Sequence, residues 1–217
     1  MTSPTDRTRP SPLDVARSKR LPAVPPSAGT GNEVLFVYVD NSNVWIEGQR
    51  ISAVKKGLAK STHDAMERKV LAHWSYDFGR LYELACPNGM KIGRSILFGS
   101  RPPVNDSLWQ RAEAGGFQVT ALDRNAANKE KKVDTSLTQM INDDYIDHMK
   151  PERGDMLVLV AGDGDFVPTI NSLKRRGIRV RVVFWRHATS RELREAADEF
   201  VELDPHFDWL SLHQSRS

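Results

Sequence analysis

Aspartates follow two apolar, strand-like runs of this chain. Asp40 ends the run "VLFVYVD", and Asp163 and Asp165 follow "MLVLVA" within the pentapeptide "GDGDF". Two carboxylates this close repel each other unless a cation or a proton intervenes. The alternative is a surface turn, where Asp and Gly are favoured and both acids are solvated.

A further aspartate, Asp134 in "KKVDTSL", is predicted to lie in the first turn of a helix over residues 133–149. An acid there has an ordinary explanation, because it interacts well with free amide groups and the helix dipole. Several acids at one edge of a sheet favour instead Mg²⁺ or Mn²⁺, which take oxygen ligands and can activate water for phosphodiester hydrolysis. We therefore predict four catalytic and metal-binding residues, Asp40, Asp134, Asp163 and Asp165, with orientation of the next helix as the alternative role of Asp165.

Other chemistries have little support in the sequence. A Gly-rich phosphate loop with Lys and Ser or Thr is missing, and the six histidines lack zinc-ligand spacing. His187 is interpreted as a solvent-exposed residue near a strand end, with contact to phosphate as the alternative. The single cysteine, Cys86, excludes an internal disulfide framework and indicates a reducing compartment, by default the cytoplasm. No small-molecule organic cofactor is predicted.

The elements that must position these acids alternate between strand and helix. Strands are expected near residues 34–39, 93–99, 117–122, 156–161, 178–185 and 200–203, and helices near 62–84, 105–114, 133–149, 165–176 and 190–199. Residues 41–58 are expected to be irregular, and Thr189 with Glu192 has the spacing of a capping box. The pattern predicts an α/β, doubly wound, Rossmann-like fold with a mostly parallel five- or six-stranded sheet and helices on both faces. In such sheets, sites form beyond the carboxyl ends of the strands.

The chain divides into a tail, a body and a short end segment. Residues 1–32 hold five basic and two acidic side chains and half of the 12 prolines, so the formal net charge of +3 arises there. We predict a disordered basic tail, which either contacts nucleic acid or simply solubilises the protein. The domain is expected at 33–205, with a C-terminal extension at 206–217. The apolar runs are strand-sized and no apolar signal segment is seen, so we expect a soluble protein without a membrane partner.

Four motifs together resemble one family. In order they are "VDNSN", "KKVDTSL", "GDGDFVPTINSLKRRGIRV" and "SRELREAADEFVEL", and they resemble the NYN domain family, LabA-like branch, of the PIN-like nucleases, across roughly residues 34–203. The resemblance implies a PIN-like fold and a metal-dependent ribonuclease, an endonuclease using Mg²⁺ or Mn²⁺, with single-stranded or structured RNA as partner and a homo-oligomer left open. By position, the four aspartates above correspond to the acidic set and Asn43 to the polar residue after the first strand.

One departure from the family pattern concerns the predicted helix after Asp134. Many relatives carry another Asp six residues further on, where this chain has Met140. Asp143 and Asp144 follow, and they are interpreted as part of a solvated face. The departure leaves a catalytically weak or inactive RNA-binding module as the alternative function. A phosphatase or nucleotide hydrolase is less favoured, because no aspartyl-phosphate pattern follows the first strand.

Polar, positively charged and aromatic residues near the same edge of the sheet are candidates for RNA binding. They are Asn41, Asn43, Trp45, Lys129, Lys131, Lys132 and Arg186. A polyanion needs positive flanks, and an aromatic face can stack on a base. The alternatives are a solvated charged face for the basic residues and packing against a helix for Trp45.

Overall fold

The computed structural model describes residues 31–87, 89–100, 107–122 and 129–212. The tail predicted at 1–32 lies almost wholly outside these residues. In the described part, six strands form one sheet in the order β3-β2-β1-β4-β5-β6, and all five neighbouring pairs are parallel. The strands are β1 (Val34–Asp40), β2 (Lys91–Ser100), β3 (Gln118–Leu122), β4 (Met156–Val160), β5 (Arg179–Phe184) and β6 (Glu199–Glu202).

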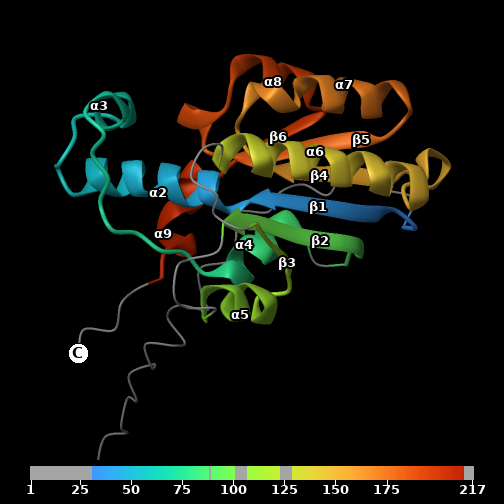
Figure 1. Ribbon diagram of the computed structural model, residues 1–217, viewed down its shortest axis with the longest axis horizontal. Helices are drawn as coiled ribbons and strands as arrows, with labels where there is room; N and C mark the ends of the chain where they lie inside the picture. The colour runs from blue at the N-terminus through green and yellow to red at the C-terminus, as the bar shows by residue number, and fades with distance from the viewer. Residues whose placement is uncertain (1–30, 88, 101–106, 123–128, 213–217) are drawn as a thin grey trace, which may run out of the picture.

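Helices cover both faces of this sheet, which confirms the predicted doubly wound α/β fold (Figure 1). The α-helices are α2 (Asn41–Lys55), α3 (Thr62–Glu67), α4 (Phe78–Ala85), α5 (Ser107–Ala114), α6 (Lys129–Asp147), α7 (Val167–Arg175), α8 (Arg191–Ala196) and α9 (Phe207–Leu210). Short 3-10 turns are η1 (Pro151–Arg153), η2 (Gly164–Phe166), η3 (Arg186–Ala188) and η4 (Asp204–His206). The chain winds from β1 outward to β3, then returns through α6 to β4 and winds outward the other way.

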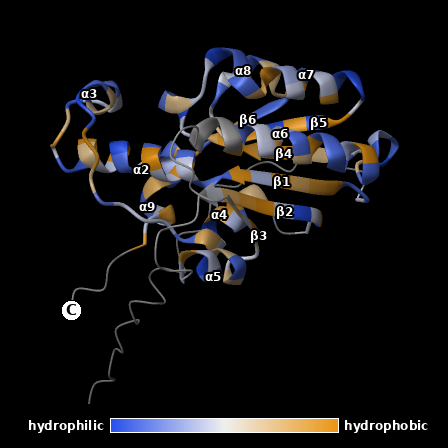
Figure 2. Ribbon diagram, viewed as in Figure 1, coloured by the Kyte–Doolittle hydropathy of each residue, from blue (hydrophilic) through white to orange (hydrophobic). Residues whose placement is uncertain are grey.

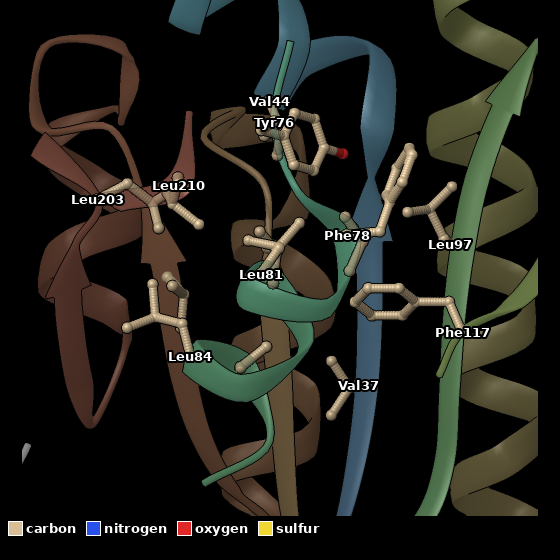
Figure 3. Packing of buried hydrophobic residues seen from close by; sticks show 14 of the residues in the cluster. Val37, Val44, Tyr76, Phe78, Leu81, Leu84, Leu97, Phe117, Leu203 and Leu210 are labelled. Atoms are coloured by element: carbon tan, nitrogen blue, oxygen red, sulfur yellow. The ribbon is translucent and has the colours of Figure 1, made fainter. Parts of the chain in front are cut away.

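The strands divide the hydrophobic core into two layers. Alternate residues of β1 point to opposite faces: Val37 belongs to the cluster under α4, α5 and α9, and Phe36 to the cluster under α6, α7 and α8. Figure 3 shows the first layer, where Leu81 and Phe117 pack around Val37. In Figure 2 the central strands are coloured as hydrophobic, as expected for strands buried on both faces.

The segment after β1 differs from the expectation. Residues predicted to be irregular form the 15-residue helix α2, whose first turn is capped by Asp40. Gly48 lies inside this helix because the Trp74 ring occupies the place of its side chain: a Cβ at Gly48 would lie 2.1 Å from that ring. Tertiary packing here overrides the weak helical pattern. The helix expected over 62–84 is instead two short helices, α3 and α4.

The predicted capping box before α8 is also wrong. The N-cap is Ser190, whose side chain accepts a hydrogen bond from the Leu193 amide. Thr189 donates its hydroxyl to the Trp185 carbonyl instead, at 2.7 Å. The cap therefore lies one residue later than its sequence spacing indicated.

The C-terminal residues contribute to the core. Phe207 stacks on Trp74 with 5.3 Å between ring centroids, and Leu210 is fully buried. Residues 206–212 of the expected extension therefore pack with the domain. Among the described residues, no helix is both long and apolar enough to cross a membrane.

Candidate active site at the carboxyl edge of the sheet

The strand order changes direction between β1 and β4. Strand β1 continues outward to β2 and β3, whereas β4 continues outward to β5 and β6, and Val39 pairs with Val160 at their carboxyl ends. The connections leave these two strands toward opposite faces, so a crevice forms beyond their ends. In doubly wound sheets this switch point is where ligands bind. The acids after β1 and β4 occupy it.

Asp40 is the buried acid of this edge, at 6% exposure. Its carboxylate caps α2 by accepting a hydrogen bond from the Asn43 amide at 3.1 Å. Beside it, Asn41 is also buried and accepts a hydrogen bond from the Tyr76 hydroxyl at 2.6 Å. Burial, with the negative charge of Asp40, raises the pKa of Tyr76 well above its usual range, so Tyr76 is a neutral donor. Asp40 is thus fixed in place by the start of α2.

Asp163 and Asp165 are exposed on the other side of the switch point. Asp163 is the N-cap of η2, and its carboxylate accepts a hydrogen bond from the Asp165 amide at 2.9 Å. Within the described part of the chain, no Lys, Arg or His side chain forms an ion pair with either acid. Gly162 packs closely against the loop after β5: a Cβ there would lie 2.3 Å from the Ala188 carbonyl oxygen. The loop is therefore held tightly while its acids face outward.

Asp134 lies on α6, which packs against β1, β2 and η2. The helix begins at Lys129, so Asp134 lies in its second turn. The sequence had predicted a position in the first turn. Asp134 is half-buried at this position. Lys129, Lys131 and Lys132 are in the first turn, and their side chains lie outside the described residues.

The structure does not gather the four aspartates into one cluster. Among the residues it describes, no three His, Cys, Asp or Glu side chains lie close enough together to hold a metal ion. Asp40 and Asp163 follow neighbouring strands, whereas Asp134 approaches from α6. Their oxygen donors are of the type that Mg²⁺ and Mn²⁺ prefer. Mg²⁺ usually takes one or two carboxylates and keeps several waters, so the donors on β1 and β4 fit such an ion in type and number.

A pocket of about 550 Å³ opens beside Asp163. It lies between α2 and α3 on one side and the loops after β4 and β5 on the other. Its lining residues are Asn43, Glu47, Arg50, Thr62, His63, Met66, Gly162, Asp163, Gly164, His187, Ala188, Thr189 and Ser190. The predicted residues Asn43 and Asp163 are thus brought to one cavity.

Sequence reasoning missed the charged wall of this pocket. Glu47 is buried and places one oxygen on Arg50 and the other 3.1 Å from His187 Nε2. The second ring nitrogen of His187, Nδ1, lies 3.8 Å from Asp204 Oδ1. Burial alone would lower the pKa of His187, but the two carboxylates outweigh it and raise that pKa. His187 is exposed near the strand end, as predicted, while its side chain, 19% exposed, is paired with two carboxylates.

A helical-face signal for part of this wall was present in the sequence. Asn43, Glu47 and Arg50 are four and three residues apart, a spacing that places them on one face of a helix. The signal was missed because no helix was predicted there. The pairing of Glu47 with His187 spans 140 residues, so only the folded chain shows it.

Two predicted RNA-binding residues lie elsewhere. Trp45 is half-exposed and donates its indole N–H to the Trp74 carbonyl at 2.8 Å, outside the pocket lining. Arg186 pairs with Glu202 and donates its backbone amide to Asp204 at 2.7 Å. Its side chain is not part of the pocket lining either.

The acids interpreted as a solvated face also differ from each other. Asp143 is exposed, but Asp144 is buried, accepts a hydrogen bond from the Tyr38 hydroxyl and forms an ion pair with Arg94. Burial and the Asp144 carboxylate raise the pKa of Tyr38 well above its ordinary value. Asp144 therefore links α6 to β1 and β2, and its interpretation as a solvated residue is wrong.

The fold and these acids define a doubly wound α/β protein with an acidic site at its switch point. The family model of the NYN domain matches residues 41–204, and the chain belongs to this family. That membership indicates a PIN-like nuclease fold and, at a coarse level, a hydrolase of a group that usually uses divalent metals. The LabA-like branch stays a prediction.

A solved structure supports the fold independently. A crystal structure of a protein of unknown function from Vibrio parahaemolyticus RIMD 2210633 superposes with a TM-score of 0.61 at 18% sequence identity. The match covers 86% of this chain and 100% of that one. A comparison with curated proteins gives no match.

Proposed function

We propose that this chain is a metal-dependent endoribonuclease that hydrolyses RNA phosphodiester bonds at the carboxyl edge of its sheet. The observation that carries the proposal is Asp163, an exposed acid without a cationic partner among the described residues, at the same edge of the sheet as buried Asp40. An acid left without a protein cation at a ligand-binding edge is suited to an exogenous cation. The family supports the nuclease class.

The chain's own residues have separate tasks in this proposal. Asp40 and Asp163 would hold Mg²⁺ or Mn²⁺, with Asp134 and Asp165 as further candidates. A bound ion of this kind supplies an activated water and stabilises charge on the phosphoryl group. The Asp165 amide fixes the Asp163 carboxylate, and α2 fixes Asp40, so both acids are oriented before substrate arrives.

The decisive experiment compares the wild type with Asp163→Asn on mixed single-stranded and structured RNAs, with Mn²⁺ or Mg²⁺ and with chelator. We expect Asp163→Asn to lose at least about 100-fold in cleavage rate, about 2.7 kcal/mol in activation free energy. Asp143→Asn is the matched control, because Asp143 is an exposed acid on α6 that should retain full activity. Equal cleavage by Asp163→Asn, or none by the wild type with either ion, contradicts the proposal.

A second function, RNA binding without cleavage, is favoured by one observation. Met140 packs against the core at the position where many relatives carry an acid, so this edge has one carboxylate fewer. In that case RNA binding persists in chelator and no divalent ion produces cleavage. The same RNA panel separates the two functions, because only the nuclease yields products.

A further inference from the structure

Arg50 is the strongest feature of the pocket that the cleavage site does not use. It lies on α2 ten residues after Asp40, and at 1.5 Å of rise per residue this is about 15 Å along the helix. Arg50 lines the same pocket as Asp163. Arg50 is thus anchored nearly three turns of α2 away from Asp40.

Glu47 keeps Arg50 in position without using all of its donors. One Glu47 oxygen pairs with Arg50 Nη1 and the other with His187 Nε2, so both oxygens are engaged. A guanidinium carries five N–H donors, and the described contact with Glu47 engages one nitrogen. The remaining donors are available to a ligand in the pocket. Such a fork suits the oxygens of a phosphate group.

His187 contributes to this wall differently. Both of its ring nitrogens are directed at carboxylates, Nε2 at Glu47 and Nδ1 at Asp204. It therefore serves as a positioning residue, which offsets the Glu47 charge and fixes the Glu47 carboxylate that holds Arg50. Arg50 remains as the group that contacts the ligand.

We propose that Arg50 binds a backbone phosphate of single-stranded RNA next to the phosphate at Asp163, so that the pocket holds the intervening nucleotide. The pocket volume of about 550 Å³ and its concave shape between two helices and two loops suit a single strand. The hydroxyl groups of Thr62 and Ser190 line the same space and add hydrogen-bonding capacity. The proposal rests on the proposed function, since it assumes that RNA is the ligand of this edge.

The test measures binding of a fluorescent single-stranded RNA oligonucleotide by anisotropy, in chelator and at several KCl concentrations. Each phosphate contact of a single strand contributes about 0.7 to the slope of log K against log salt. We expect Arg50→Gln to lower the absolute slope by about 0.7 and to weaken binding about tenfold at low salt, while Arg50→Lys keeps the slope. Arg175→Gln is the matched control, since Arg175 is an exposed arginine at the end of α7, near the opposite edge of the sheet.

A second measurement locates the contact. Replacing single RNA phosphates with neutral methylphosphonates should weaken wild-type binding at one position without affecting Arg50→Gln at that position. Inorganic phosphate as competitor should have little effect, because the site is proposed to read a phosphate within a strand. Effective competition by inorganic phosphate, an unchanged slope in Arg50→Gln, or an equal loss in Arg175→Gln overturns the proposal.

The outcome is separable from that of the nuclease proposal. Binding in chelator does not require cleavage, so an Arg50-dependent slope in a protein that never cleaves contradicts only the nuclease. Metal-dependent cleavage with an unchanged Arg50→Gln slope contradicts only the phosphate contact. Absence of wild-type RNA binding overturns the Arg50 proposal directly.

Discussion

Strand β4 has an aspartate near each end, and the two acids have opposite surroundings. Asp155, just before β4, is fully buried and pairs with Arg153 through two hydrogen bonds of 2.6 and 2.5 Å. It also accepts hydrogen bonds from the Val34 and Lys150 amides. Asp163, after β4, is exposed, and its carboxylate accepts a hydrogen bond from one backbone amide.

The difference teaches how a structural acid is distinguished from a candidate site acid. Both follow a glycine, in "RGDML" and "AGDGD", so the local motif does not separate them. A buried carboxylate is retained only when cations and donors compensate its lost hydration, as they do at Asp155. An acid that has no protein cation and lies at the switch point is available to a ligand cation instead.

The largest expected effect in this comparison is on stability at the amino end of β4. Asp155→Ala leaves the Arg153 charge and the Val34 and Lys150 amides without their acceptor, at a cost of about 3 kcal/mol in the free energy of unfolding. Asp163→Ala removes only a one-turn cap and should cost about 1 kcal/mol or less. Urea unfolding monitored by circular dichroism measures both. Similar costs at the two positions would contradict the distinction.

Much of the fold was predictable because its determinants are local. Continuous apolar runs separated by helical stretches indicated buried parallel strands, and the observed sheet has six of them. Helix α2 was not predictable in this way, since its Gly48 is accommodated by the ring of Trp74, 26 residues later in the chain. A tertiary contact of this kind has no signal in a sequence window.

The candidate site was predictable to the extent that it depends on strand ends. Asp40 and Asp163 were placed at one edge because parallel strands end together, and in the structure Asp40 ends β1 and Asp163 follows its neighbour β4. The wall of Glu47, Arg50 and His187 was missed, because it joins α2 to the loop after β5. The pairing of His187 with Glu47 depends on both segments being in place, which sequence periodicity does not show.

The two glycines of "GDGDF" also differ in their surroundings, and only one is predicted to be structurally required. A Cβ at Gly162 would lie 2.3 Å from the Ala188 carbonyl oxygen and 2.5 Å from the Phe184 ring. Gly162→Ala should therefore cost about 1 to 3 kcal/mol through overpacking. At Gly164 the nearest atom is the Ser190 hydroxyl at 3.2 Å, which needs to shift by only a few tenths of an ångström and can keep its cap on the Leu193 amide. Gly164→Ala should stay within about 0.5 kcal/mol of the wild type, and thermal unfolding of the two variants distinguishes them.

The smallest expected effect is on the pH dependence of the free energy of unfolding. It concerns acids that pair with a histidine, which loses its charge as the pH rises. Glu47 and Asp204 both face His187, whose pKa is raised above the usual value despite burial. The folded state thus binds this proton more tightly than the unfolded state. The stabilisation is fully present below the ordinary histidine pKa of about 6.5 and is lost as the pH rises through the raised value. Asp155, paired with an arginine that stays charged, should show no such loss over this range.

This contribution can be isolated by comparing the wild type with His187→Asn. Free energies of unfolding from urea titrations between pH 5.5 and 9 should fall with pH more steeply in the wild type than in the variant. Asp204 does not interfere, because its lowered pKa affects stability only in the acidic range. His206 has a pKa lowered by burial and remains in both proteins, so its effect cancels in the difference. Parallel pH profiles of the two proteins would show that the two carboxylates do not hold the His187 proton. The carboxyl edge of the sheet would then be fixed by permanent charges, as the amino edge is.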